Sequence, residues 1–447
     1  MKRKFHVRCR AREKIKIISK SYLLLSLLPE TGYMFEKEGY EIVTFNTIDF
    51  SKSLHYNPLA YIQSEKDILK VVNVLMENTK GEGHNSGDKF WQDAEKLLYT
   101  AIIAYLISEK NPKERNIPSM IEMIEGFKIM EDDETHMSFS DYKFEELREK
   151  NPDCLAVKQY TKFKQAAGRT MKTILISCAA RLAPFDIEEV REATMDDQLE
   201  LNMIGSRKTA FFIIMSDTDT TFSFLIAMIM YQMFNLLCEK ADNIYEGALP
   251  FRVRCLFDEF SNIGKIPDFH KLISTIRSRN ISCMIILQSL NQLNSLYKED
   301  AETIIDCCDT LVFLGGKSIK TTKQISEMIG KTTINTKQTS ESKGQNGSFT
   351  FQNGILGRDL IDASEISRLK RNECLVLISG LPPFKSNKYK TYKHKRYKDI
   401  YDGGAPLFDV AEYNRKVKEE YDEFLRGLDE EYEDYEDYED VDYDDYN

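Results

Sequence analysis

The chain has 447 residues, 42% of them hydrophobic and 30% charged. That balance fits a folded protein of two or three domains and excludes a chain that is disordered throughout. The formal net charge is −11, but residues 429–447 hold twelve acids and no Lys or Arg, so the rest of the chain is close to neutral.

Cysteine usage and apolar segments both point to a cytosol-facing protein. The nine cysteines are scattered and form no Cys-x-x-Cys pair, which indicates reduced residues and no zinc site. The apolar run 22–28 follows a basic start, but it is not a signal peptide and is too short to span a bilayer. The run 222–237 contains Gln232 and Asn235 and predicts a buried core helix. We therefore expect a cytoplasmic chain without a membrane-spanning segment.

Short runs of apolar and β-branched residues predict the strands of a sheet. They lie at 41–48, 209–216, 252–259, 281–289, 309–316 and 373–380. Helical patterns separate most of these runs. The runs themselves are typical of buried strands. The alternation predicts an α/β fold with a parallel sheet and helices on both faces.

A helical insertion interrupts this pattern between the first two strands. Apolar residues recur at helical spacing in 65–79 and 88–110, and more loosely in 155–185. A polar loop is expected at 331–354. The predicted organisation is an atypical basic start (1–30), an α/β domain (31–60 and 206–400), an all-helical domain (61–205) and a disordered acidic, Tyr-rich tail (401–447).

Two adjacent carboxylates, Asp258 and Glu259, follow the third predicted strand. At the carboxyl end of a strand in a nucleotide-hydrolysing sheet, Asp258 would bind Mg²⁺, directly or through water, and Glu259 would polarise the attacking water. The alternative is a strand that ends in two solvated acids.

The next strand ends at Gln288, a polar side chain suited to sensing a γ-phosphate. Arg277 and Arg279 lie just before that strand, and either guanidinium could reach the nucleotide of a neighbouring subunit as an arginine finger. The alternative for each arginine is a salt bridge or a phosphate contact to DNA.

Residues 256–297 resemble the Walker B region of type IV secretion coupling proteins of the TraG/TraD kind. The resemblance continues through 56–62, 90–91, 163–185, 216–229, 308–317 and 382–389. It implies a RecA/FtsK-like motor domain with an all-helical domain, in a hexamer at the cytoplasmic face of the cell membrane. Such a protein hydrolyses ATP with Mg²⁺ and passes relaxase-bound single-stranded DNA, and sometimes proteins, to a secretion channel. Arg277 then becomes the better finger candidate, because it lies eleven residues before Gln288 as in the family.

The resemblance is incomplete at the start of the chain. No Gly-x-x-x-x-Gly-Lys-Ser/Thr phosphate loop occurs, and the nearest pattern, AAGRT at 166–170, lacks the lysine and is expected in mid-helix. Residues 1–28 match nothing in the family, which suggests an N-terminally truncated chain read from a wrong frame or a late start. We therefore expect this chain alone to bind ATP poorly and not to hydrolyse it.

Two terminal segments suggest partners. In 388–401, Lys388, Lys390, Lys393 and Arg396 would contact DNA phosphates while the interleaved tyrosines stack on bases; the alternative is a solvated edge strand or linker. The acidic tail would dock a relaxase, a relaxosome accessory protein or a secreted substrate, or simply solubilise the chain. A non-catalytic module that binds substrate or relaxosome is the competing function, and a chromosome-partitioning DNA pump is a third.

Overall fold

The computed structural model describes residues 22–79, 89–128, 136–166, 168–216, 218–341, 349–419 and 423. These residues fall into two compact units. Unit 1 comprises residues 256–261 and 285–397, and unit 2 comprises the described residues of 19–255, 262–284 and 398–447. The division passes through the strands β3 (Val253–Phe257) and β4 (Ile281–Ile285).

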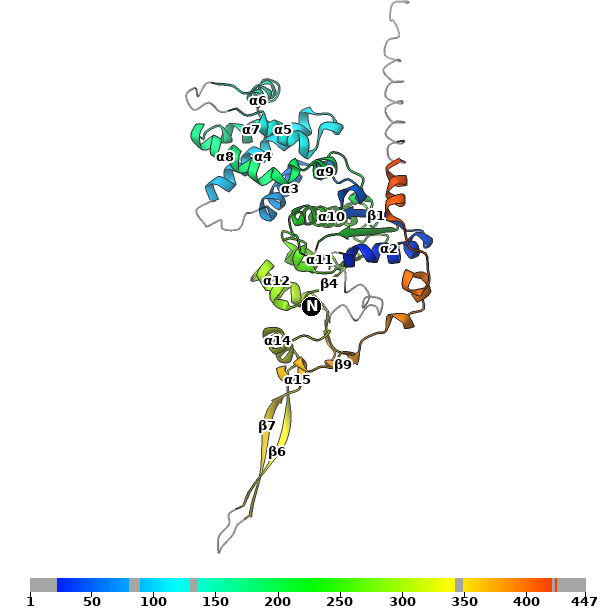
Figure 1. Cartoon of the computed structure of the whole chain (residues 1–447). Coiled ribbons are helices and arrows are strands. Elements are labelled where there is room, and N and C mark those ends of the chain that lie inside the picture. The colour runs from blue at the N-terminus through cyan, green and yellow to red at the C-terminus, as the bar shows by residue number, and fades with distance from the viewer. Residues whose placement is uncertain are drawn as a thin grey trace, which may run out of the picture. The chain divides into compact units, whose positions relative to one another are not determined.

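Unit 2 contains a parallel strand pair with a long helical insertion between its strands. Strand β1 (Glu41–Asn46) pairs in parallel with β2 (Thr209–Ile214), from Glu41 opposite Thr209 to Asn46 opposite Ile214. Between them the described elements are all helices, as the apolar spacing predicts (Figure 1). The α-helices of the insertion are α3 (Glu65–Asn78), α4 (Lys89–Glu109), α5 (Ile117–Glu125), α6 (Phe139–Lys150), α7 (Leu155–Phe163), α8 (Gly168–Leu182) and α9 (Glu188–Glu192).

Helix α10 (Ser223–Asn243) is the apolar segment expected in the core. It is the one helix in the described part of the chain that is long and apolar enough to cross a membrane, and 72% of its apolar window is buried within the protein. The polar group inside the run is satisfied there, because Gln232 Nε2 donates to the carbonyl of Pro58 and Gln232 Oε1 accepts from Tyr56. The prediction of a buried core helix is confirmed.

The packed part of unit 2 extends beyond the predicted boundary at residue 400. Phe408 joins Leu28, Ile42 and Ile214 in one apolar cluster, and its backbone N–H donates to the carbonyl of Pro29 in α2 (Tyr22–Lys37). Further along the chain, Asn414 Nδ2 donates to the carbonyl of Lys52, 2.8 Å away. Residues 405–414 are therefore part of the fold, whereas the acidic run 429–447 lies outside the described residues.

Unit 2 also contains α11 (Phe269–Thr275).

Unit 1 contains an antiparallel sheet, where we expected parallel strands. Its strands run in the order β5 (Thr310–Phe313), β8 (Glu373–Ile378) and β9 (Phe384–Asn387), and both pairings are antiparallel. The connection between β5 and β8 runs out along a hairpin and back, so β8 begins near the end of β5 and returns in the opposite direction. The prediction that all six strands are parallel is wrong for β5 and β8. The helices of unit 1 are α12 (Leu290–Tyr297), α13 (Asp300–Asp306), α14 (Ile319–Ile329) and α15 (Ala363–Ser367).

The predicted polar loop is a two-stranded ribbon. Strands β6 (Lys331–Glu341) and β7 (Phe349–Asp359) pair antiparallel along their whole length and extend away from α14 and α15 (Figure 1). Polar side chains occupy both faces of the ribbon, so the sequence lacks the apolar alternation that marks a half-buried strand. The β-branched Thr and Ile residues of β6 still favour the extended backbone.

Strands β3 and β4 form a separate pair. Val253 N–H donates to the carbonyl of Asn280, and Ile286 N–H donates to that of Phe257, so both strands advance in the same direction. Side chains alternate between buried and exposed along each strand, and Leu256 is 57% exposed. The prediction of fully buried strands is therefore confirmed for β1 but wrong for β3 and β4.

Candidate functional site

The predicted carboxylates lie in a turn that the ends of β3 and β4 hold in place. Asp258 and Glu259 follow β3 directly, and the 3₁₀ turn Phe260–Asn262 comes next. Phe260 N–H donates to the carbonyl of Ile286, and Ile286 N–H donates to the carbonyl of Phe257 at 2.8 Å. The strand ends therefore fix the backbone on both sides of the two acids.

The structure brings Glu259 and Gln288 together. Gln288 Nε2 donates to Glu259 Oε2 across 2.8 Å, although the residues are 29 positions apart. Gln292, in the first turn of α12, accepts hydrogen bonds at Oε1 from the backbone N–H of Gln288 (2.8 Å) and of Ser289 (3.3 Å). Sequence reasoning did not single out Gln292. Its signal was present, because a Ser followed three residues later by Gln is a capping box.

The backbone of Glu259 has a conformation that L-residues disfavour. Its φ of 52° lies in the left-handed region, where a non-glycine residue is uncommon and costs about 1–2 kcal/mol. Such conformations persist where the surrounding structure imposes them, and they cluster at functional sites. The strained backbone and the hydrogen bond from Gln288 together fix the direction in which the Glu259 carboxylate points.

Asp258 is half-buried beside Glu259. Among the described residues, no group of three or more His, Cys, Asp or Glu side chains could hold a metal ion on its own. Magnesium usually binds through one or two carboxylates together with nucleotide phosphates and waters. The donor set at Asp258 therefore fits Mg²⁺ that arrives with a nucleotide and does not fit a metal held by the protein alone.

The two candidate arginines have different surroundings in unit 2. The Arg279 guanidinium forms two hydrogen bonds with the carboxylate of Asp242, at 2.9 and 2.7 Å. This bonding to Asp242 raises the pKa of Arg279 and lowers that of Asp242. Arg277 is exposed, and among the described residues no hydrogen bond or ion pair engages its guanidinium. Arg279 is thus occupied within its own chain, and Arg277 is available for a contact outside it.

The segment nearest to a phosphate-loop pattern does not lie in mid-helix. Helix α7 ends at Phe163 and α8 begins at Gly168, so AAGRT at 166–170 spans the start of a helix. The expectation of a mid-helix position is wrong, because the apolar spacing of 155–185 runs on past the point where α7 ends and α8 begins. The segment still has no lysine that could reach a phosphate.

The basic segment after β9 forms 3₁₀ turns, at Thr391–Lys393 and Tyr397–Asp399, and is mostly exposed. Lys388 belongs to the fold, because its Nζ donates to the carbonyl of Leu314 at 2.6 Å and burial lowers its pKa. Lys390 and Lys393 are exposed, and Arg396 is half-buried. A role of these four residues in DNA binding remains a prediction.

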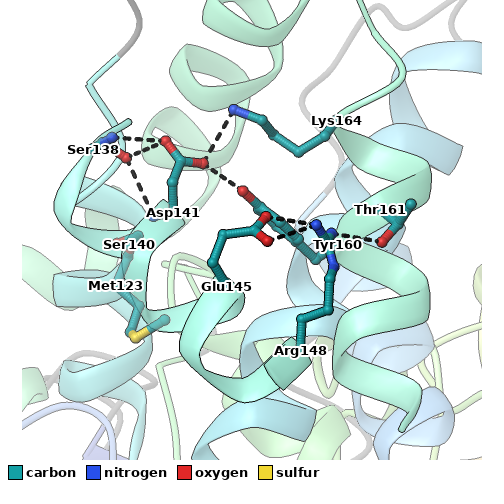
Figure 2. A network of polar contacts seen from close by, with 9 residues as sticks. All are labelled: Met123, Ser138, Ser140, Asp141, Glu145, Arg148, Tyr160, Thr161 and Lys164. Atoms are coloured by element: carbon teal, nitrogen blue, oxygen red, sulfur yellow. Dashed lines mark hydrogen bonds and ion pairs between the residues drawn. The ribbon is translucent and has the colours of Figure 1, made fainter. Parts of the chain in front are cut away.

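The helical insertion contains a buried polar network that sequence reasoning did not identify (Figure 2). Asp141 in α6 accepts hydrogen bonds from Tyr160 Oη (2.7 Å) and Lys164 Nζ (3.1 Å), and from the backbone and side chain of Ser138. Burial acts to raise the pKa of Asp141, but these hydrogen bonds outweigh it and lower the pKa. The Tyr160 ring stacks on Phe144 with centroids 4.4 Å apart. The network joins α6 to α7 and the residues after it, so its role is structural.

Comparison with known proteins gives one consistent family. Residues 26–408 match the family described as "Type IV secretory system Conjugative DNA transfer". The type IV secretion system-coupling protein VirD4 of Bartonella quintana is 21% identical over 78% of this chain and 53% of that protein. Protein VirD4 of Agrobacterium fabrum is 25% identical over 48% of this chain and 32% of that protein. The chain thus spans about half or less of the length of these relatives.

Solved structures of the plasmid coupling protein TrwB share the fold. One of them is an unbound form lacking 70 N-terminal residues. It matches this chain with a TM-score of 0.55 at 15% identity, and the match covers 83% of each of the two chains. A complex with ADP and Mg²⁺ has a TM-score of 0.53 at 15% identity and likewise covers 83% of each chain. At these identities the likeness concerns the fold, which is the RecA-like α/β fold of coupling proteins with many added helices. The strand-end acids, the fold and the match over residues 26–408 agree, and the chain belongs to the type IV secretion coupling proteins of conjugative DNA transfer.

Proposed function

We propose that this chain is the motor domain of a coupling protein that recruits relaxase-bound single-stranded DNA and drives its transfer through a type IV secretion channel. ATP hydrolysis in the full-length form would power that transfer. The observation that carries the proposal is the hydrogen bond between Glu259 and Gln288 at the ends of adjacent strands. It supports the proposal because a water-polarising acid and a phosphate sensor must share one crevice at the carboxyl ends of the strands.

Each site residue has a distinct role in this proposal. Mg²⁺ bound with ATP neutralises charge on the phosphates, and Asp258 would hold it through a water. Glu259 would orient and polarise the attacking water, and its hydrogen bond to Gln288 would report whether a γ-phosphate is present. Arg277 would reach the nucleotide of the neighbouring subunit in a homo-hexamer, which fits its exposed guanidinium.

The proposed partners follow from the same function. Relaxosome accessory proteins would be recruited with the DNA strand, and the secretion channel would receive it at the cytoplasmic face of the cell membrane. The basic segment around Lys390, Lys393 and Arg396 and the acidic run 429–447 are the candidate contacts for DNA and for basic protein partners.

A non-catalytic role is the second candidate function. The observation that favours it is that the 447 residues contain no Gly-x-x-x-x-Gly-Lys-Ser/Thr loop. Backbone amides and a lysine for the phosphates would then be missing, and the chain would bind substrate or relaxosome proteins without turnover.

Phosphate release from ATP tests the proposed function. The purified chain should release phosphate at the background rate, whereas a longer form that carries a phosphate loop should turn ATP over. In that longer form Asp258→Ala should abolish turnover. Asp306→Ala, which changes an exposed acid at the end of α13, should leave turnover unchanged. Turnover that survives Asp258→Ala would contradict the role given to Asp258. Vigorous turnover by the 447-residue chain would contradict the expectation that this chain does not hydrolyse ATP by itself, and it would exclude the non-catalytic role.

A further inference from the structure

Unit 1 contains a strongly basic surface at the start of β8 and the end of β9. Residues 368–397 hold nine Lys or Arg and a single acid, Glu373, in a chain whose net charge is −11. The basic residues of this segment, which we call the basic surface, are Arg368, Lys370, Arg371, Lys385, Lys388, Lys390, Lys393, Lys395 and Arg396. Lys388 and Arg396 are half-buried, and the other seven are exposed.

The pairing of β8 with β9 brings the two ends of this segment together. Glu373 lies opposite Asn387, and Lys388 N–H donates to the carbonyl of Asn372 at 2.7 Å. The residues just before β8 therefore lie beside those just after β9. Burial lowers the pKa of Lys388, and the nearby positive charge of Arg371 lowers that pKa further. Positive charges from both ends of the segment are thus close enough to repel one another.

Little of this charge is neutralised within the described part of the chain. The carboxylate of Glu373 is already paired with Lys385, whose Nζ lies 3.3 Å away. Among the described residues, no ion pair engages Lys370, Lys390, Lys393 or Lys395. An anionic partner would relieve the repulsion between these charges.

The acidic run 429–447 has the matching chemistry. It holds twelve Asp or Glu, five tyrosines and no Lys or Arg, and residues 432–440 repeat Tyr-Glu-Asp three times. Carboxylates pair with lysine and arginine, and tyrosine rings attract the same cations to their faces. Residues 420–447 can extend by up to roughly 95 Å, several times the radius of gyration of a domain, which is about 13–16 Å. The run is therefore long enough to reach a surface on its own chain.

We propose that the acidic run 429–447 docks on the basic surface of its own chain and competes there with other polyanions, including single-stranded DNA. The competition with DNA rests on the proposed function, which gives Lys390, Lys393 and Arg396 a DNA contact, but the docking itself does not. The chain's own run fits better than a separate acidic partner, because attachment supplies it at an effective concentration on the order of millimolar. A basic protein that captures the run would free the surface for DNA.

Zero-length cross-linking with a carbodiimide, which joins a carboxylate to a lysine amine, tests the docking on the full chain. Mass spectrometry should find the acids of 429–447 joined to the lysines of the basic surface, with a yield that falls steeply between roughly 50 and 500 mM salt. Lys320 and Lys323, which are exposed on α14, are the control and should carry few such links. Equal yields at the two sets of lysines overturn the proposal. In a mixture of isotopically labelled and unlabelled chains, links only between the two kinds of copy overturn it as well.

Fluorescence anisotropy with a labelled single-stranded oligonucleotide tests the competition. A full-length variant in which Asn and Gln replace the twelve acids of 429–447 should bind about tenfold more tightly than the unaltered chain, because the attached competitor is lost. This gain should shrink in chains that carry Lys390→Gln and Lys393→Gln, and it should persist in chains that carry Lys320→Gln and Lys323→Gln. A gain of equal size in both backgrounds would show that the run acts through overall charge, and the docking proposal would fail.

The two measurements separate this inference from the proposed function. If the unaltered chain binds the oligonucleotide but no links join the run to the basic surface, the docking proposal fails and the proposed function stands. If no form of the chain binds the oligonucleotide, the proposed function loses support, and the cross-links alone decide whether the run docks.

Discussion

The side chain of Gln288 donates a 2.8 Å hydrogen bond to Glu259, a residue whose φ of 52° an L-amino acid adopts only at a cost. The pair joins the turns that follow β3 and β4, so the polar contact and the strained backbone occur at one place. In the proposed function both features keep the Glu259 carboxylate aimed at a reacting water.

The strain at Glu259 can be measured with two substitutions. Glu259→Ala and Glu259→Gly both remove the hydrogen bond to Gln288, but only glycine relieves the left-handed backbone. We expect the glycine variant to be more stable than the alanine variant by about 1 kcal/mol in urea unfolding. An alanine variant of equal or greater stability would mean that the backbone is not strained at this position.

The buried ion pair of Arg181 and Glu95 should dominate the stability of the helical insertion. Arg181 Nε and Glu95 Oε2 are 2.7 Å apart, their side chains are 4% and 2% exposed, and Arg181 also donates to Thr79. Glu95→Gln removes one charge and leaves the other buried, which should cost about 3–5 kcal/mol in chemical unfolding.

The exposed pair of Arg191 and Glu122 provides the control for that experiment. Its atoms are 2.8 Å apart, but both side chains are largely solvated. Glu122→Gln should change the free energy of unfolding by no more than about 1 kcal/mol. Equal losses at the two pairs would show that burial does not set the value of the Arg181 pair.

Asp197 should make stability depend on pH. Burial raises the pKa of Asp197 to about 7, despite hydrogen bonds from Tyr61 and from the backbone of Asn57 and Glu200. Because the folded-state pKa exceeds the unfolded value near 3.8, ionisation opposes folding. Its contribution should therefore fall as the pH rises from about 4 to 7, by at most about 1.4 kcal/mol per pH unit.

The variant Asp197→Asn removes this titration. Its stability relative to the unaltered chain should rise between pH 4 and 7 and stay constant above about pH 8. Urea unfolding at pH 4.5, 6, 7 and 8 measures the difference. A difference that does not change with pH would show that Asp197 is ionised in the folded protein throughout this range.

Gly32 in α2 should be required for the packing of the C-terminal segment. A Cβ atom built at Gly32 would lie 2.5 Å from the ring of Phe408, closer than such atoms approach. Gly32→Ala should therefore displace residues 405–414 and expose them to limited proteolysis. Adding Phe408→Gly removes both the ring and the Cβ atom, which would lie 3.0 Å from the new methyl group. The double variant should therefore unfold with a higher urea midpoint than Phe408→Gly alone, because alanine favours a helix over glycine. Resistance of Gly32→Ala to proteolysis would contradict this packing.

The sequence predicts the elements that carry a strong periodic signal. The six strands and the helical insertion follow from β-branched runs and from 3.6-residue spacing, and all occur in the structure. The β6–β7 ribbon was missed because both of its faces mix polar and apolar side chains, so the alternation that reveals a strand is absent. The direction of β8 depends on where the ribbon returns the chain, which no local pattern encodes.

In the candidate site too, local patterns predict the residues but not the contacts between them. Asp258, Glu259 and Gln288 stand out because polar residues follow apolar strands. The contact between Glu259 and Gln288 also depends on the pairing of β3 with β4. Arg279 differs from Arg277 because it bonds to Asp242, which is 37 residues away from Arg279 in the chain. Long-range pairing of this kind cannot be read from spacing along one sequence.

The measurement that tests the central claim most directly is the frequency of conjugative DNA transfer from cells in which the mobile element encodes Glu259→Gln. The substitution keeps the size of the side chain and removes the charge that would polarise water. We predict that transfer falls to the frequency seen when the gene is deleted, with the protein present at its normal level. Transfer at the unaltered frequency, in cells where deletion of the gene abolishes it, would contradict the motor assignment and favour the non-catalytic binding role.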